Sequence, residues 1–239
     1  MDKTEDTVGL LDYSKHKIKL VADSYAEKAY RISSCKREPL TVEWIESMPK
    51  NSCFWDIGAN VGAYSLIAAK QNNCEMVVAC EPHWQNFNHL TKNIILNQMQ
   101  DKIVPVCIAL YDKNQFADLN HREQNSYHFM EAGSSGHQIN TFTGESGKDF
   151  EPSGTTKSLC LNLDLLTKLY KFQHNYLKID VDGVENEILQ GAKSSLKNNF
   201  FESIMVEANI RSDLILKLLE SCNYHFKMNG EHANQFWGL

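Results

Sequence analysis

The chain has 239 residues, of which 42% are hydrophobic and 23% charged, and this composition suits a single α/β domain with a large core. Its net charge of −6 and isoelectric point near 5.8 disfavour a surface that neutralises the many phosphates of a nucleic acid. The cysteines form no C-x-x-C pair, the first residues are polar and no apolar stretch could span a bilayer, so we expect a cytoplasmic protein without a zinc knuckle or a redox dithiol.

Residues 1–50 are predicted to form a helical cap on the main domain, which spans residues 51–239 and belongs to the same unit. Apolar residues recur at helical spacing in two parts of this segment, residues 25–32 and residues 39–48. The pattern predicts packing and indicates no chemistry of its own.

A glycine-rich turn near residue 58 organises the rest of the chain. The run Phe54–Ile57 is apolar apart from Asp56, and apolar residues then recur at helical spacing over residues 61–69, which predicts a strand, a tight turn and a helix. A turn of this kind, after the first strand of a parallel sheet, is a common ligand cradle. Gly58 and Gly62 permit a positive φ and a close approach of the backbone to a ligand.

The same turn discriminates between ligands. Asn60 stands where the dinucleotide fingerprint has its second glycine, so a pyrophosphate would be crowded. No Gly-Lys-Ser or Gly-Lys-Thr follows, so the P-loop pattern is absent as well. S-adenosylmethionine (SAM) carries an ammonium and a sulfonium but no phosphate, and Asp56 suits a cation. We therefore predict a SAM site that includes Asp56, Gly58, Asn60 and Gly62.

The next predicted strand, residues 75–80, ends in a second acid. Glu81 follows the turn at about the ~20-residue spacing at which an acid accepts hydrogen bonds from ribose hydroxyls. A solvated acid at a strand end is the alternative. Because the acid and the glycine turn occur together at this spacing, we assign Glu81 to the nucleoside.

A helix over residues 83–99 and a strand over residues 102–110 are predicted next. Pro105 indicates an edge strand or the start of a strand, since proline cannot donate a ladder hydrogen bond. We expect the end of this strand, around Ile108 and Ala109, to lie near the adenine ring of the cofactor.

Residues 112–158 are rich in Asn, His, Ser, Gly and Thr. A stretch this long inside a compact domain is usually functional or disordered, and we interpret it as a lid or acceptor-binding insertion with short strands. Its histidines, His121, His128 and His137, lack a tight metal-ligand spacing. We interpret them as solvated loop residues, one of which could serve as a base.

A second informative stretch covers residues 175–185. It follows a predicted strand over residues 159–163 and a helix that Asp164 could cap. An apolar strand delivers Asp180 and Asp182, which point to the same side because they are two residues apart.

These two acids face the same crevice as the first two strand ends, which suggests a catalytic base or a pair of ligands for a hard metal such as Mg²⁺. Glu207, at the end of a predicted strand over residues 201–207, is a possible third ligand. The alternative is that one of the paired carboxylates caps the following helix and the other forms a salt bridge with Lys178.

The last elements complete the sheet. We predict a helix that starts at Ser212 or Asp213, and then two segments, residues 224–228 and 235–239, on either side of Asn229-Gly230, a dipeptide that favours a hairpin.

Taken together, DIGANVGAYSLIAAK, VVACEP and LKIDVDGVENEILQGA resemble the FkbM family of SAM-dependent methyltransferases, over roughly residues 38–209. The resemblance implies a class I Rossmann-like fold: a mostly parallel seven-stranded sheet with helices on both faces and an antiparallel last strand. It also implies methylation of a hydroxyl, often on a sugar of a glycan or on a small metabolite. By motif, Asp56, Gly58, Asn60, Gly62 and Glu81 would hold the cofactor, and Asp180 and Asp182 would lie beside the acceptor. Many relatives have glutamate where this chain has Asp182.

The predicted reaction is an in-line attack of an acceptor hydroxyl on the sulfonium methyl. Asp180 or Asp182 would take the proton, either directly or with a bound divalent cation. A nucleic-acid methyltransferase is a competing hypothesis, disfavoured by the acidic charge and by the lack of any Pro-Pro. An NAD-dependent oxidoreductase is disfavoured by Asn60, and a non-catalytic scaffold is disfavoured by the retained acids.

Overall fold

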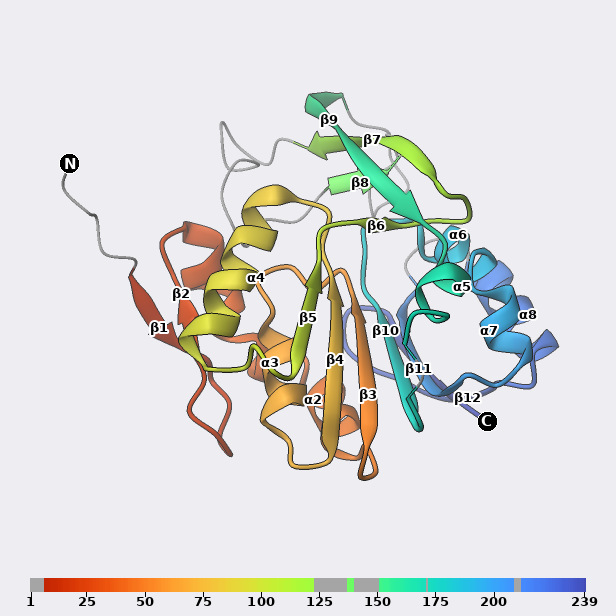
Figure 1. The fold of residues 1–239 in the computed structure, drawn as a ribbon, viewed down its shortest axis with the longest axis horizontal. Coiled ribbons are helices and arrows are strands. Elements are labelled where there is room, and N and C mark those ends of the chain that lie inside the picture. Colours follow the sequence, from red (N-terminus) through yellow and green to blue (C-terminus); the bar gives the residue numbers. More distant parts are fainter. Residues whose placement is uncertain (1–6, 123–136, 140–150, 171, 209–211) are drawn as a thin grey trace.

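The structure, a computed structural model, describes residues 7–122, 137–139, 151–170, 172–208 and 212–239 (Figure 1). Its described residues form a central seven-stranded sheet in the order β12-β13-β11-β10-β3-β4-β5. The strands are β3 (Ser52–Ile57), β4 (Cys74–Cys80), β5 (Ile103–Val106), β10 (Asn175–Ile179), β11 (Phe201–Glu207), β12 (His225–Asn229) and β13 (Asn234–Gly238).

Only one of these seven strands runs against the others. Strand β13 is antiparallel to both of its neighbours, β11 and β12, whereas the other adjacent pairs are parallel. The predicted sheet, with its antiparallel last strand, is therefore confirmed. Strand β5 lies at the edge of the sheet, where Pro105 leaves no ladder donor unsatisfied.

Helices cover both faces of this sheet. Because side chains alternate along a strand, Phe54 and Trp55 belong to two different core clusters, one on each face. Helices α2 (Pro39–Glu46), α3 (Ala63–Lys70) and α4 (Trp84–Leu96) pack with Phe54. Helices α5 (Leu163–Leu166), α6 (Glu185–Gln190), α7 (Lys193–Lys197) and α8 (Ser212–Ser221) lie on the Trp55 face. In the described residues, no helix is both long enough and apolar enough to cross a membrane.

The N-terminal segment packs along α4. It contains a two-stranded antiparallel sheet, β1 (Val8–Leu10) and β2 (Lys19–Val21), which the sequence does not predict, followed by the π-helix η1 (Glu27–Arg31) and by α1 (Ser34–Arg37). The backbone amides of Lys19 and Val21 donate to the side chains of Asn97 and Asn93, at 2.9 and 2.7 Å. The two helices expected in this segment are represented by η1 and α2. Its role as a cap stays a prediction.

A second sheet lies over the carboxyl end of the central one (Figure 1). It has the order β6-β9-β7-β8, with strands β6 (Ala109–Leu110), β7 (Gln115–Arg122), β8 (His137–Ile139) and β9 (Pro152–Leu161). The predicted insertion thus contains strands, although residues 123–136 and 140–150 lie outside the described residues.

Two local predictions are wrong. The strand expected over residues 102–110 is divided, because a bond of 3.0 Å from the Ile108 amide to the Val106 carbonyl turns the chain out of the central sheet. The helix after β9 is capped by Asn162, whose side chain accepts from the Leu165 amide at 2.8 Å, rather than by Asp164. Asp164 lies in the first turn instead, where its carboxylate accepts from the amides that begin α7.

Candidate functional site

Four acids mark the carboxyl ends of four adjacent strands. Asp56 lies near the end of β3, Glu81 follows β4, Asp180 follows β10 and Glu207 ends β11. These strands are neighbours in the sheet, and their parallel direction brings the acids to one edge. Ligands of open α/β sheets bind at this edge.

The glycine turn is shaped by close backbone contacts. Gly58, Asn60 and Gly62 all have positive φ, at 84°, 51° and 88°. A Cβ on Gly58 would overlap the carbonyl oxygen of Asp180, and one on Gly62 would overlap the side chain of Leu90. Glycine is therefore required at both positions by conformation and by space.

Glu81 is bonded directly to this turn. Its Oε2 accepts from the Asn60 amide at 2.9 Å and its Oε1 from the His83 amide at 2.8 Å. Burial raises the pKa of Glu81 to about 7, even though these hydrogen bonds favour the charged form. A carboxylate offers about four lone-pair sites, so Glu81 can hold the turn and still accept ligand hydroxyls.

A buried lysine links two of the predicted site acids. Lys178 is 1% exposed, and its Nζ lies 2.7 Å from Oδ2 of Asp180 and 3.5 Å from Oδ1 of Asp56. Oδ2 of Asp56 also accepts from the Ser65 hydroxyl at 2.6 Å, so the Asp56 carboxylate is held inside the protein. The salt bridge between Lys178 and one of the paired acids, which is the alternative considered from the sequence, exists with Asp180, and Lys178 also pairs with Asp56.

This ion pair sets the charge of Asp180. Burial alone would raise its pKa, but the ammonium of Lys178, the charge of Arg31 and a hydrogen bond with Glu207 hold it below its usual range. Burial alone would likewise lower the pKa of Lys178, but Asp180 and Asp56 raise it. Asp180 is thus an ionised, weakly basic carboxylate whose side chain remains 30% exposed.

Asp182 lies on the side of the small sheet. Its Oδ2 accepts from the backbone amide of His137 at 3.2 Å, which connects the end of β10 to β8. The turn that follows is closed by Glu185, whose Oε1 accepts from the Gly183 amide at 3.0 Å. Neither Asp180 nor Asp182 is the N-cap of α6, a position held by Val184.

Ala109 lies in β6, and its position near the adenine ring stays a prediction. Its side chain is buried in the core of the small sheet with Ala117, Leu119 and Cys160. Ile108 is buried in the main core. Both side chains are therefore in packing contacts.

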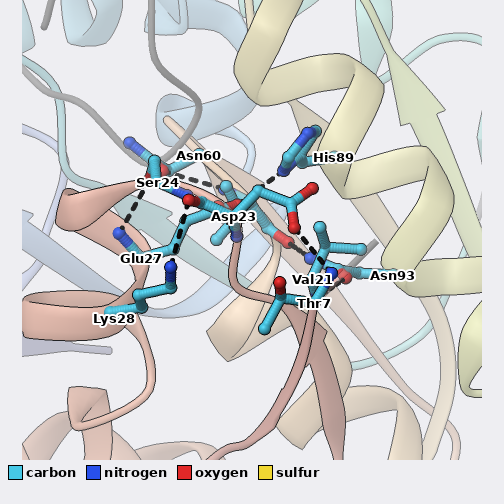
Figure 2. A network of polar contacts seen from close by, with 10 residues as sticks. Thr7, Val21, Asp23, Ser24, Glu27, Lys28, Asn60, His89 and Asn93 are labelled. Carbon is cyan, nitrogen blue, oxygen red and sulfur yellow. Dashed lines mark hydrogen bonds and ion pairs between the residues drawn. The ribbon is translucent and has the colours of Figure 1, made fainter. Parts of the chain in front are cut away.

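The N-terminal segment contributes a cation that the sequence does not predict as part of the site. The positive charge of Arg31 acts to lower the pKa of Glu81, of Asp180 and of His137, so Arg31 lies in the neighbourhood of all three residues. Its helix is anchored by Glu27, a buried acid that accepts from the amides of Asp23 and Ser24 and pairs with the His89 ring at 2.6 Å (Figure 2).

The anchored segment also reaches the glycine turn. Asn60 belongs to the same network of polar contacts as Ser24 and Glu27 (Figure 2). The helix α4 and its C-cap present His89, Asn93 and Asn97 to this segment at intervals of four residues. That polar stripe is the sequence signal that would have indicated the contact.

The interpretation of the loop histidines as solvated is wrong for the two that the structure describes. His121 is buried, and His137 is half-buried. His128 lies outside the described residues. His83, which the sequence analysis does not single out, lies beside them, with its ring centroid 3.9 Å from that of His137. Strand pairing brings these residues together, and their spacing in sequence gave no indication of it.

Comparison with known proteins identifies the family. The model of the methyltransferase FkbM domain matches residues 56–226, which include the five predicted site acids, Asp56, Glu81, Asp180, Asp182 and Glu207. The chain belongs to the FkbM methyltransferase family. The resemblance read from the motifs is therefore confirmed, and the protein is a methyltransferase.

A curated relative and a solved structure are also similar to this chain. A curated relative, the hexuronic acid methyltransferase AglP of Haloferax volcanii, is 24% identical over 194 residues, which cover 81% of this chain and 72% of AglP. The crystal structure of methyltransferase FkbM from Methylobacillus flagellatus KT matches with a TM-score of 0.51 and 13% identity over 83% of this chain. The match spans 50% of that longer chain, so it supports the fold alone.

Proposed function

We propose that this FkbM domain binds SAM at the carboxyl ends of β3 and β4 and transfers its methyl group to a hydroxyl of a sugar or glycan. The observation that carries the proposal is the bond between Glu81 and the Asn60 amide, at 2.9 Å, because it joins the predicted ribose acid to the turn whose glycines leave room for a ligand. The residues at this edge fit SAM, since they combine acids with an open turn that has neither a P-loop lysine nor the second glycine of the dinucleotide fingerprint.

When bound, SAM supplies an electrophilic methyl group on a sulfonium. The residues of the chain must orient it: Gly58, Asn60 and Gly62 supply the turn, and Glu81 accepts from the ribose hydroxyls. The Asp56 carboxylate contacts Ser65 and Lys178 and holds them in place. Its role in cofactor binding is therefore to position these residues rather than to contact the ligand.

Two findings support a sugar acid as the acceptor. AglP is named a hexuronic acid methyltransferase. The positive charge of Arg31 also acts to lower the pKa of Asp180, which indicates that it lies near this acid, and a guanidinium can bind a carboxylate in a bidentate, charge-assisted manner. We infer that Arg31 pairs with the carboxylate of a uronic acid.

Of the two candidate bases, Asp182 is the better proton acceptor. Asp180 is neutralised by Lys178 at 2.7 Å, which weakens it as a base. Asp182 faces the small sheet, where an acceptor would enter. In the proposed reaction, the hydroxyl oxygen bonds the methyl carbon, the carbon–sulfur bond breaks and the hydroxyl proton passes to the Asp182 carboxylate. A magnesium ion held by Asp180, Asp182 and Glu207 would compete with the ammonium of Lys178, so we favour proton transfer without it.

The test is calorimetry of S-adenosylhomocysteine binding, followed by a transfer assay with radiolabelled SAM. Glu81→Ala should weaken binding by one to two powers of ten, since hydrogen bonds to a charged group contribute about 1.5–3 kcal/mol. Glu202→Ala, which removes a half-exposed acid paired with His174, is the matched control and should leave binding unchanged.

The transfer assay compares glucuronic acid oligosaccharides, neutral oligosaccharides and RNA. Transfer to the uronic acid that Arg31→Ala reduces would support the proposal. Transfer to RNA alone would contradict the sugar acceptor. Cofactor binding without transfer to any acceptor would favour a non-catalytic scaffold.

A further inference from the structure

Three histidines from distant parts of the chain converge at the edge of the site. His83 lies between β4 and α4, His121 lies in β7 and His137 lies in β8. One ring nitrogen from each can be chosen so that all three atoms lie within 4.8 Å of one another. Among the described residues, these three histidines form the one group of at least three His, Cys, Asp or Glu side chains whose ligand atoms are this close together.

Strand pairing fixes two of the three. His121 and His137 are directly opposite each other in the antiparallel pair of β7 and β8, and their Nδ1 atoms are 3.0 Å apart. The other ring nitrogen of His121, Nε2, lies 3.0 Å from the Thr156 hydroxyl of β9. That contact orients the His121 ring and leaves Nδ1 directed at the cluster, as outer hydrogen bonds commonly do for metal-binding histidines.

The third histidine, His83, is buried, and its ring nitrogens lack hydrogen-bond partners of good geometry among the described residues. His83 is 1% exposed, and the Asn86 side chain lies close enough to act on its pKa. Buried polar groups are nearly always paired, so the orphaned ring indicates a missing partner. Its ring is stacked on that of His137, 3.9 Å between centroids and 11° from parallel.

The three rings are also held in the form that binds metals. Burial lowers the pKa of His83 to about 4, and it lowers the pKa of His121 and His137 as well. Neutral imidazole is the ligand form of histidine.

We propose that His83, His121 and His137 bind one divalent transition-metal ion, with zinc as the leading candidate. Imidazole nitrogens suit zinc, cobalt, nickel, copper and iron rather than magnesium. Three protein ligands leave a position open, which is the arrangement of catalytic rather than structural zinc. Binding requires His83 and His137 to turn from their stacked position so that both direct a nitrogen at the ion.

The position of the cluster suggests its role. The His83 amide donates to Glu81 at 2.8 Å, and the His137 amide donates to Asp182 at 3.2 Å. The ion would thus lie between the acid assigned to the cofactor ribose and the acid assigned to the acceptor proton. At its open position it would polarise the acceptor hydroxyl before Asp182 takes the proton. This role rests on the proposed function, whereas metal binding does not.

The experiment titrates the metal-stripped protein with Co²⁺ and then displaces it with Zn²⁺, following the visible absorption of cobalt in a site of low coordination. We expect one equivalent to bind with imidazole-type bands and without a thiolate charge-transfer band. His121→Ala and His137→Ala should each weaken binding at least tenfold. His225→Ala, an exposed histidine of β12, and Cys107→Ser, an exposed thiol, should leave it unchanged.

Each variant is checked for its melting temperature and for S-adenosylhomocysteine binding, so that unfolding is recognised. His121→Gln, which keeps the size of the side chain, serves if the alanine variant does not fold. Failure of the wild type to bind Co²⁺ or Zn²⁺ would overturn the proposal, as would uptake that the histidine variants leave unchanged. If the wild type did not bind S-adenosylhomocysteine, that result would instead count against the proposed function. Metal binding without any effect of Zn²⁺ on transfer would overturn the role at the acceptor alone.

Discussion

The carbonyl oxygen of Asp180 lies 2.0 Å from the position that a Cβ on Gly58 would occupy. The same residue donates its amide to the Ile57 carbonyl at 3.0 Å, so the ends of β3 and β10 are locked together at this point. The two motifs that the sequence analysis treats separately are thus one structural unit, in which the cofactor turn is pressed against the acid-bearing strand.

Gly58→Ala should therefore disrupt both halves of the site. A residue with a side chain at this positive φ costs about 1–2 kcal/mol, and relief of the overlap with Asp180 adds to that cost. We expect a lower urea midpoint and loss of S-adenosylhomocysteine binding. Gly154→Ala, in strand β9, is the control. A Gly58→Ala protein with normal binding would show that the turn can move away from Asp180.

Glu81 should make both stability and cofactor binding depend on pH. Its pKa in the folded chain, about 7, lies above the ordinary value of 4.5, so the folded chain keeps a proton that the unfolded chain has lost. The contribution to stability is complete below about 4.5 and disappears as the pH rises through about 7. Ribose hydroxyls donate to the ionised form, so affinity for S-adenosylhomocysteine should rise over the same range. Calorimetry at several pH values should show this rise in the wild type and a flat profile in Glu81→Gln.

Lys178→Met should destabilise the fold strongly. It leaves Asp56 buried without its counter-ion, a change that typically costs about 3–5 kcal/mol. The exposed pair of Lys157 and Asp118 provides the comparison, since Lys157→Met should cost less than about 1 kcal/mol. Chemical unfolding measures both. Equal costs for the two variants would mean that Asp56 finds another partner.

Asp182→Asn should separate chemistry from binding. Loss of a general base reduces turnover by about 10²–10⁴-fold, while S-adenosylhomocysteine affinity should stay within twofold, about 0.4 kcal/mol. The transfer assay and calorimetry together give the two numbers. If Asp180→Asn reduced turnover and Asp182→Asn did not, the roles of the two acids would be exchanged.

Glu27→Ala should loosen the N-terminal segment. The amides of Asp23 and Ser24 lose a buried acceptor, and each unsatisfied group costs about 1–3 kcal/mol. Hydrogen exchange should accelerate over residues 19–31, and cofactor affinity should fall because Asn60 shares this network (Figure 2). Glu43→Ala, at an exposed position of α2, should change neither.

The sheet and the edge that carries the site could be predicted because they depend on local patterns. Runs such as Ser52–Ile57 are buried on both faces, and an acid lies at the end of each run or directly after it. The contact of Lys178 with Asp180 could also be predicted from the sequence. The two residues are two positions apart at the end of one strand, so their side chains point to the same side.

What escaped prediction depends on contacts between distant segments. His83 and His137 are far apart in sequence, and only the register of β7 with β8 and the position of the small sheet bring them together. The helix that carries Arg31 is fixed by Glu27 and His89, a contact between two segments that each appear merely amphipathic. The cap at Asn162 was missed because Asn162 and Asp164, two residues apart, were equally suitable for that position.

The insertion of β13 between β11 and β12 imposes an order of assembly. Among the strands that the structure describes, β13 is the one to which β12 is hydrogen-bonded, and all five residues of β12 are exposed. Strand β12 cannot join the sheet before the strand that follows it in the chain, so the hairpin around Asn229-Gly230 must form first or dock as one piece, led by the buried Trp237. Slow folding steps should then concentrate in this last hairpin, and the amides of β12 should never be protected longer than those of β13.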